Sequence, residues 1–242
     1  MALRKVYVRF KEDVPENANC YAALDGFRQL GVETVPFYGF GDIDEMQDLG
    51  PEVGIVGYLG DVWEALEKQG KQRPDVVDYP AELKDFTRRL IYQSTIENVR
   101  AVTGPVFVKP VKHKLFTGFV WNQSKADRLH LAPYPSQTTV WVSNVVEFIS
   151  EYRVFVLDGE ILDVRRYKGS WSVAPQMQWV EDAIAAYVTA PRAYSLDLGI
   201  GPSGRLNPYL VEINDCLSLG SYGLASIPYA KMIEARWTEL TG

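Results

Sequence analysis

The stretch YLVEIND, residues 209–215, places two polar side chains inside a segment that otherwise reads as a buried strand. Aliphatic residues stand on both sides of Glu212 and just before Asn214. Because side chains alternate along a strand, the glutamate and the asparagine point to the same face. A charge that faces a protein interior is costly unless it has a partner. The stretch therefore indicates a polar site on one face of a sheet.

The composition is that of a folded globular protein with a net acidic charge. The 242 residues are 47% hydrophobic and 23% charged, and the formal net charge is −6. A chain of this length can bury one large core or two smaller ones. The acidic balance argues against binding of bulk nucleic acid or of an anionic membrane.

Targeting signals and cysteines indicate where the protein works. No apolar run approaches the roughly 20 residues that a transmembrane helix needs. The first residues, MALRKVYVRF, read as an alternating strand and lack the apolar segment and cleavage site of a signal peptide. The two cysteines, Cys20 and Cys216, make no disulfide framework. We therefore expect a cytoplasmic protein without a membrane partner.

Strands and helices alternate over the N-terminal third of the chain. Strands are predicted at KVYVRF, VETVPFYGF and VGIVGYLG, with helices from about Glu16 and from an N-cap at Asp61. This alternation predicts a small α/β domain over residues 1–78. The segment QRPDVVDYP is the candidate linker to a second domain over residues 79–242.

The second domain is predicted to be richer in strands. It begins with one long helix over AELKDFTRRLIYQSTIENV, followed by strands at PVFVKPV and TTVWVSNVVEFI. EYRVFVLDGEILDVRRYKG reads as a hairpin, because Asp158-Gly159 is a favoured two-residue turn. Counting from this turn pairs Arg153 with Val164 and places Arg166 on the same face. The C-terminal segment has the spacing of an amphipathic helix.

Three oxygen-bearing side chains are predicted to converge near the C-terminus. The strand AYSLDLGI precedes YLVEIND, and if the two pair, Asp197 lies beside Glu212 and Asn214. Carboxylate and amide oxygens are hard ligands that suit Mg²⁺. In the alternative interpretation, Asp197 caps a turn and Glu212 pairs with an arginine such as Arg166 or Arg205.

Upstream cations complete this pattern. Lys109 ends the strand VFVKP, Lys114 lies in the loop KHKLFTG, and Arg153 lies inside a strand between apolar neighbours. An arginine in such a strand needs an anion to face. Cations together with Mg²⁺ ligands are the chemistry that binds a triphosphate. The alternatives are a strand-end lysine that extends into solvent and a solvated charge cluster in the loop.

The order of these segments resembles the ATP-grasp superfamily. VFVKP, VVEFISEYRVFVLDGEIL, SLDLGI and YLVEIND occur in sequence, whereas GxxxxGK[ST], GxGxxG after a strand and the protein-kinase motifs are missing. KPVKHKLFTG, EYRVFVLDG and VEINDCLSLGSYG are similar to a bacterial and phage-associated clade with one characteristic arginine and paired lysines. The resemblance implies an α+β fold that holds a nucleotide between two subdomains, preceded by a small α/β pre-ATP-grasp domain.

The resemblance also implies a role for each matching residue. The adenine edge and the ribose would be contacted by four neighbouring residues: Glu147, Phe148, Ile149 and Glu151. The phosphates of ATP would be bound by Lys109, Lys114 and Arg153. The catalytic cations would be Arg153, Lys114 and Lys168. The Mg²⁺ ligands would be Asp197, Glu212 and Asn214.

Two loops and one cysteine need separate interpretation. Many ATP-grasp enzymes have a longer Gly-rich flap after the first lysine, whereas VKHKLFTGFVWN contains a single glycine. The loop SLGSYG, residues 218–223, either binds a second substrate through backbone N–H groups or only turns the chain. Cys216 is expected to be a small buried residue rather than a nucleophile, because no histidine lies near it in sequence.

The resemblance implies an ATP- and Mg²⁺-dependent carboxylate–amine ligase. ATP would phosphorylate a carboxylate to an acyl-phosphate, and an amine would then displace the phosphate. The alternatives are phosphoryl transfer to a hydroxyl at the same nucleotide site and a non-catalytic nucleotide-binding module. The expected partners are ATP, a carboxylate and an amine, as small molecules or peptides, and exposed aromatic residues would allow a homodimer.

Overall fold

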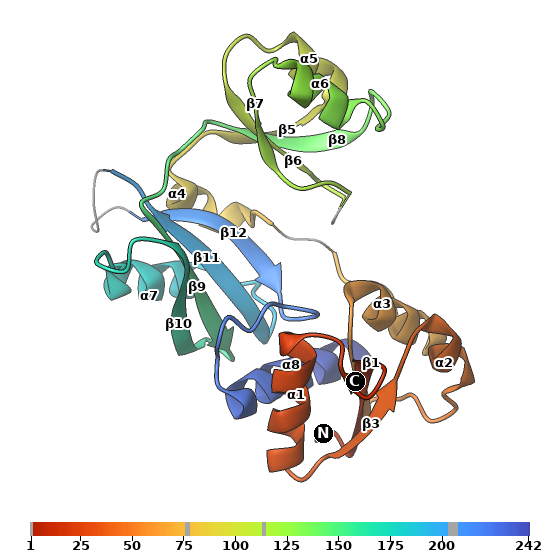
Figure 1. The fold of residues 1–242 in the computed structure, drawn as a ribbon. Coiled ribbons are helices and arrows are strands. Elements are labelled where there is room, and N and C mark those ends of the chain that lie inside the picture. The colour runs from red at the N-terminus through yellow and green to blue at the C-terminus, as the bar shows by residue number, and fades with distance from the viewer. Residues whose placement is uncertain (1, 76–77, 113–114, 203–207) are drawn as a thin grey trace.

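The computed structural model describes residues 2–75, 78–112, 115–202 and 208–242 (Figure 1). Within these ranges the chain forms three four-stranded sheets, and Figure 1 shows each of them in its own part of the molecule. Among these residues, no helix has the length and apolar character that crossing a bilayer requires.

The N-terminal sheet is mainly parallel and has β1 at its centre. β1 pairs in parallel with β3 and β4 and antiparallel with the short β2. The strands are β1 (Lys5–Lys11), β2 (Val14–Pro15), β3 (Glu33–Phe37) and β4 (Val53–Val56). The helices of this region are α1 (Ala18–Gln29), α2 (Phe40–Glu45) and α3 (Leu59–Lys68). The predicted alternation of strands and helices is confirmed.

Polar side chains start two of these helices. Asn17 precedes α1, and its side-chain oxygen accepts the backbone N–H groups of Asn19 and Cys20, which have no partner within the helix. The prediction that Asp61 is the N-cap of α3 is wrong. Asp61 is the third residue of α3, and its buried carboxylate accepts the N–H of Tyr58 at 2.7 Å from within the first turn.

The second sheet is antiparallel, with the strand order β5-β8-β6-β7. Its strands are β5 (Ile91–Thr95), β6 (Val106–Pro110), β7 (Phe119–Trp121) and β8 (Thr139–Ser143). The helices α5 (Ile96–Ala101) and α6 (Lys125–Leu131) contribute to its hydrophobic core, which includes Val108, Trp121 and Val142. Figure 1 shows this subdomain at the top, away from both chain ends.

The long helix predicted over residues 81–99 is wrong. The segment forms a 3₁₀ turn at Ala81–Leu83, a one-turn helix α4 (Lys84–Thr87), the strand β5 and the helix α5. Arg88 has a left-handed backbone with a φ of 51°, which ends α4. β5 pairs with β8 along its whole length, so pairing between distant segments overrides the local helical spacing.

The third sheet is also antiparallel, with the order β10-β9-β11-β12. Its strands are β9 (Ser150–Leu157), β10 (Glu160–Gly169), β11 (Ala193–Ile200) and β12 (Tyr209–Asp215). The helix α7 (Met177–Ala186) packs on one face, in a cluster with Val154 and Leu196. Because side chains alternate, Arg153 and Asp197 point to the opposite face. This second face carries the candidate site.

The β9–β10 hairpin confirms the predicted turn but corrects the predicted register. Asp158 and Gly159 both have positive φ angles, of 50° and 83°, as the predicted turn requires. A β-bulge between Ile161 and Asp163 adds one residue to β10, so that Arg153 lies opposite Arg165 and not opposite Val164. The bulge also moves Arg166 to the face opposite Arg153.

The predicted C-terminal helix is confirmed as α8 (Ser226–Thr241), and it packs on α1. Gly26 allows this close approach, because a Cβ there would overlap with the carbonyl group of Ser226. Tyr229 and Trp237 belong to the same hydrophobic cluster as the N-terminal sheet. The predicted boundary after residue 78 stays a prediction, and the hydrophobic core crosses it.

Candidate active site

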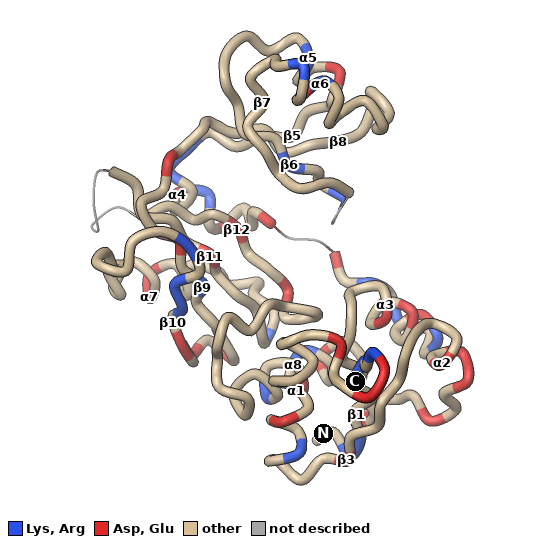
Figure 2. Tube along the Cα trace, viewed as in Figure 1, with Lys and Arg blue, Asp and Glu red and all other residues tan. Residues whose placement is uncertain are grey.

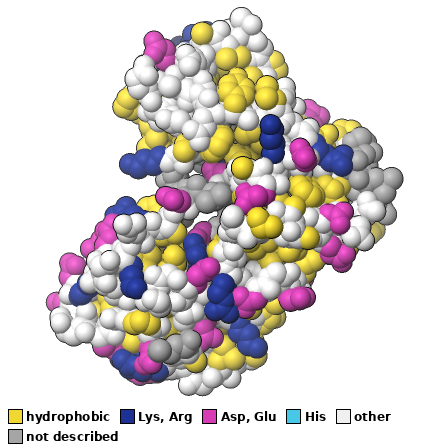
Figure 3. Space-filling model, turned by 180° about the vertical axis from the view of Figure 1, so that it is seen from behind, with side chains coloured by type: hydrophobic (Ala, Val, Ile, Leu, Met, Phe, Trp, Pro, Cys, Tyr) yellow, Lys and Arg dark blue, Asp and Glu magenta, His cyan; other side chains and the backbone are white. Residues whose placement is uncertain are grey.

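Two cavities meet between the second and third sheets, where Figure 3 shows the molecule hollowed between its upper and lower parts. The first cavity, of about 260 Å³, is lined by residues that include Tyr79, Phe148, Glu151 and Lys168. The second, of about 340 Å³, is lined by residues that include Asp78, Lys109, Thr117 and Asn214. Glu212 lines both cavities and marks their junction.

The three predicted oxygen donors do converge on one face of the third sheet. Asp197 lies opposite Glu212 on one neighbouring strand and opposite Arg153 on the other. The Nδ2 of Asn214 donates to Oδ2 of Asp197 at 3.3 Å. The sequence therefore placed these four side chains together correctly, and the strand pairing explains why.

Arg153 and Asp197 form a two-fold ion pair. The Nε and Nη2 of Arg153 donate to the two carboxylate oxygens of Asp197 at 2.8 and 2.7 Å. Only 6% of Arg153 and 3% of Asp197 are exposed. Burial raises the pKa of the Asp197 carboxyl to about 6, and the hydrogen bonds from Arg153 oppose that rise. The anion that Arg153 faces is thus Asp197.

Lys109 bridges two carboxylates at the junction of the cavities. Its Nζ donates to Asp78 at 2.8 Å and to Glu212 at 2.5 Å. Burial acts against its charge, but the two carboxylates more than compensate and raise the pKa of Lys109. Burial likewise opposes the charge of Glu212, and Lys109 outweighs it and lowers the pKa of that carboxyl. Lys109 is therefore a charged lysine that points into the site.

Asp78 and Arg89 were missed by the sequence analysis. Asp78 lies in the segment predicted as a linker, and its carbonyl oxygen accepts the N–H of Ile213 on β12. Arg89 lies in the segment predicted as a helix, and it donates to the carbonyl oxygens of Leu210 and Val211 at 2.6 and 3.1 Å. No local pattern marks either residue, because both are placed by contacts with β12, far along the chain.

The predicted adenine-binding segment borders the first cavity. Phe148 lines the cavity and covers Gly199, whose missing side chain makes room for the ring. The backbone N–H of Ile149 donates to Ile200, and its carbonyl oxygen accepts from Ser170. Both backbone groups of Ile149 are therefore used inside the protein. The neighbouring exposed residue in this segment is Glu147.

Glu151 joins Lys168 at the same cavity. Its carboxylate accepts from the Nζ of Lys168 at 2.5 Å and from the hydroxyl of Tyr167 at 3.1 Å. The ring of Tyr167 stacks on Tyr222 with centroids 5.3 Å apart, and the guanidinium of Arg153 lies 4.7 Å from the Tyr222 centroid. The structure thus pairs Lys168 with the predicted ribose-binding acid and places it on the side of the first cavity.

The predicted second lysine, Lys114, lies outside the described residues. After it, the chain is held by Phe116, whose ring packs near Phe119 and Tyr134. Thr117 and Gly118 then line the second cavity. A side chain at Gly118 would overlap with the ring of Phe107, so the single glycine of this loop is a close-packed position.

The SLGSYG loop is more than a turn. The carbonyl oxygen of Gly220 accepts from Arg153 at 3.3 Å. The hydroxyl of Ser218 donates to the carbonyl oxygen of Gly57 at 2.9 Å, and the N–H of Ser221 donates to Asn19 at 2.9 Å. The loop therefore connects the buried arginine with the N-terminal sheet.

The candidate metal site depends on few carboxylates. In the part of the chain that the structure describes, no group of three or more His, Cys, Asp and Glu side chains could hold a metal ion. Asp197, Glu212 and Asn214 supply two carboxylates and one amide. Such a set fits Mg²⁺, which keeps several waters and shares its remaining positions with phosphate oxygens.

Two antiparallel sheets with charged and oxygen-bearing side chains between them define an ATP-grasp protein, as the motif order predicted. The chain belongs to a family of ATP-grasp domains, family 2 of its clade, whose sequence profile matches residues 86–232.

Solved structures with a similar fold cover nearly the whole chain. D-cycloserine synthetase DcsG is 15% identical, with a TM-score of 0.60 over 96% of this chain and 99% of that chain. D-alanine–D-alanine ligase from Bacillus anthracis is 12% identical, with a TM-score of 0.59 over 100% and 98%. The ATP-grasp ligase PsnB, complexed with minimal precursor, is 16% identical, with a TM-score of 0.53 over 97% and 99%. At these identities the likeness shows the fold alone. No protein of curated function matches the sequence.

Proposed function

We propose that the protein is an ATP- and Mg²⁺-dependent ligase that joins a carboxylate to an amine through an acyl-phosphate. The observation that carries the proposal is the position of Lys109, which lies between Asp78 and Glu212 where the two cavities meet. A charged lysine at this junction, with Arg153 on the neighbouring strands, suits a chain of phosphates that runs from one cavity to the other.

The first cavity would hold the nucleoside part of ATP. Phe148 supplies an apolar wall for the adenine ring, and Glu147 lies beside it on the exposed edge. Glu151 would accept hydrogen bonds from the ribose hydroxyls. Lys168, which contacts Glu151, would then neutralise phosphate charge from the sugar side. Lys114 is proposed as the second phosphate lysine on the resemblance alone.

The ion pairs of the site would exchange partners when nucleotide binds. Lys109 and Arg153 now neutralise Glu212 and Asp197. If the two cations turn towards phosphate oxygens, both carboxylates become free to bind a divalent cation together with Asn214. Mg²⁺ bound there supplies positive charge that polarises the phosphoryl group and neutralises charge in the transition state.

The chain's own residues would orient and stabilise the reacting groups. Arg153, held rigidly in a buried strand, would bind the transferring phosphoryl group while a carboxylate oxygen attacks phosphorus and ADP leaves. The amine nitrogen would then attack the acyl carbon. A C–N bond forms, the C–O bond to phosphate breaks, inorganic phosphate leaves and the nitrogen loses one proton.

Hydroxylamine trapping tests the proposal. The protein is incubated with ATP, Mg²⁺, a panel of carboxylic acids and hydroxylamine, and hydroxamate and ADP are measured together. We expect a hydroxamate with a subset of the acids, and none with the Lys109→Ala variant. A phosphorylated hydroxyl compound without hydroxamate would identify a phosphotransferase. Nucleotide binding without ADP release over a broad panel would identify a binding module. A cytoplasmic location and a homodimer stay predictions, and gel filtration tests the second.

A further inference from the structure

A third cavity, of about 130 Å³, lies on the far side of the second cavity. It shares Asp78 and Asn214 with the second cavity, and Arg153 also lines it. The remaining wall comes from helix α3, from the segment that precedes Asp78 and from the loop after β12. A ligand in this cavity would therefore lie next to the proposed reaction centre, on the side away from adenine.

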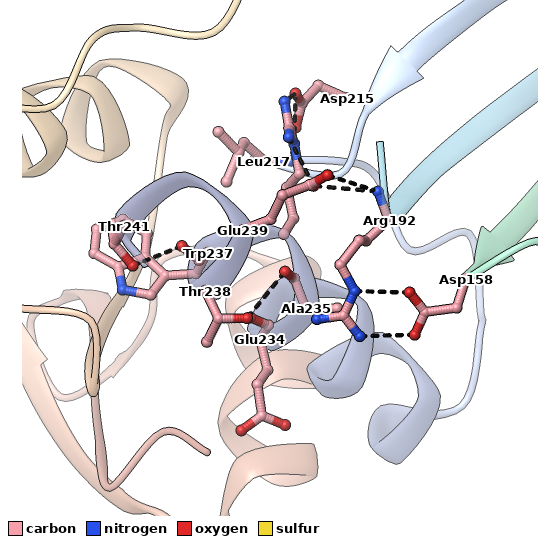
Figure 4. Close-up of polar contacts among 11 residues, drawn as sticks. Asp158, Arg192, Asp215, Leu217, Glu234, Ala235, Trp237, Thr238, Glu239 and Thr241 are labelled. Carbon is pink, nitrogen blue, oxygen red and sulfur yellow. Dashed lines mark hydrogen bonds and ion pairs between the residues drawn. The ribbon is translucent and has the colours of Figure 1, made fainter. Parts of the chain in front are cut away.

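Acidic side chains line this cavity and the groove that continues from it. Asp75, Asp78 and Asp215 line the cavity, and Asp75 and Asp215 also line the adjoining groove, which reaches Glu239 on α8. Figure 4 shows Asp215 and Glu239 close together beside α8. Figure 2 shows further acidic residues along α2 and α3.

The cations that line these surfaces already have partners. Arg153 binds Asp197. Arg236 is shared between Asp215, at 2.6 Å, and Glu239, at 2.8 Å. One guanidinium thus neutralises only part of the charge of this carboxylate pair. Asp75 lies exposed at the point where cavity and groove join. The lining therefore has an excess of negative charge.

One wall of the cavity is apolar. Leu59 and Trp63 contribute from α3, and Leu217 and Leu219 contribute from the loop after β12. An apolar wall beside carboxylates suits a ligand that has both a hydrocarbon chain and a positive charge, since the wall removes methylene groups from water while the carboxylates bind the charge.

We propose that this cavity binds the amine substrate, and that this substrate is an aliphatic amine with a second positive charge. The inference rests on the proposed ligase function and names the class of its acceptor. The reacting nitrogen lies at the Asp78–Asn214 end, next to the phosphate site. The alkyl chain packs on Trp63 and Leu217, and the distal ammonium binds near Asp75 and Asp215.

Calorimetric titration tests this proposal without knowledge of the carboxylate substrate. The probes are the α,ω-diamines from 1,3-diaminopropane to 1,6-diaminohexane, with hexylamine and adipate for comparison. We expect at least one diamine to bind about tenfold or more tightly than hexylamine, because a second ion pair in a partly buried site adds about this factor, and we expect no binding of adipate. Equal affinity for hexylamine and every diamine would overturn the proposal.

Two variants and one control locate the site. Asp75→Asn is expected to weaken binding of the best diamine about fivefold to tenfold, and Trp63→Ala is expected to weaken diamine and hexylamine alike. The matched control is Glu181→Gln, which removes one negative charge from an exposed position on α7. Wild-type affinity of the Asp75→Asn variant, or equal weakening in the control, would overturn the assignment.

A parallel titration with ATP and Mg²⁺ separates this proposal from the proposed function. If diamine binds and nucleotide does not, the assignment of the cavity stands and the ligase function fails. If nucleotide binds and no diamine binds, the acceptor class fails and the nucleotide site stands. A diamine-binding site that survives both Asp75→Asn and Trp63→Ala would lie elsewhere and would contradict the proposal.

Discussion

Arg153 and Asp197 contribute to the stability of the fold as a pair and not as single residues. Removal of one member would leave a buried group without its partner, which costs about 3 kcal/mol or more. We expect Arg153→Met to lower the free energy of unfolding by about this amount, and the double variant Arg153→Met/Asp197→Leu to recover much of it. Urea unfolding followed by circular dichroism measures both. A double variant less stable than the single variant would contradict the expectation.

Glu212 is the residue whose loss should separate nucleotide binding from metal binding. Glu212→Ala removes a proposed Mg²⁺ ligand and leaves Lys109 with Asp78 alone. We expect the affinity for ATP in the presence of Mg²⁺ to fall about tenfold or more, and turnover to be abolished. Calorimetric titrations with and without Mg²⁺ check this, with Glu181→Gln as the control. An unchanged dependence of ATP affinity on Mg²⁺ would remove Glu212 from the metal site.

The two cysteines should be unreactive in the folded protein. Burial raises the pKa of the Cys20 thiol from 9.0 to about 11 and raises that of Cys216 as well. At pH 8 only about one Cys20 thiol in a thousand would be ionised, and the thiolate is the reactive form. Between pH 9 and pH 11 the unfolded chain releases this proton first, so stability is lost as the pH rises through that range.

Ellman's reagent provides the measurement. We expect almost no colour from native protein at pH 8 and two thiols per chain in denaturant. Rapid reaction of Cys216 in native protein would reopen the question of a nucleophilic role. A slow reaction that accelerates with denaturant reports unfolding instead.

At the scale of elements, the contact between α1 and α8 should be sensitive to one methyl group. In the variant Gly26→Ala the new Cβ would overlap with backbone atoms of Ser226, which cannot rotate away. We expect a loss of about 1–3 kcal/mol, typical of overpacking. The control is Gly41→Ala in α2, where nothing lies within 4 Å of the added Cβ. Thermal unfolding compares the two, and equal melting temperatures would contradict the tight contact.

Local patterns predicted many elements but failed where distant contacts decide. Asn17, the Asp158-Gly159 turn and the spacing in α8 are local signals, and the structure confirms the elements they predicted. The segment 91–95 has helical spacing and becomes a strand only because β8 lies beside it. The bulge after Ile161 changes the register of β10, and no turn residue marks it.

At the scale of the whole molecule, the N-terminal region and the C-terminal helix should depend on each other. Residues from Val6 to Phe37 and from Cys216 to Trp237 contribute to one hydrophobic cluster. A fragment of residues 79–242 would expose the apolar side of α8. We expect it to bind the dye ANS and to aggregate, and we expect co-expression with residues 1–78 to restore a complex. Gel filtration checks both, and a stable monomeric fragment would contradict the expectation.

The candidate site could be predicted from the sequence only in part. Arg153, Asp197, Glu212 and Asn214 lie on strands whose pairing follows from their order, so the polar residues among apolar neighbours were visible. The third cavity was not visible, because α3, the linker and the loop after β12 are far apart in the sequence. Only the docking of the N-terminal region against the third sheet brings them together.

The bridge from Lys109 to Asp78 has a consequence for the order in which substrates bind. Asp78 borders both the phosphate cavity and the third cavity. If a triphosphate draws Lys109 away, Asp78 loses its cation and the field in the third cavity becomes more negative. Occupancy of one site would then raise affinity at the other, and thermodynamic reciprocity makes this coupling equal in both directions. Steady-state kinetics would show positive cooperativity between the two substrates, with the nucleotide as the leading reactant in an ordered mechanism.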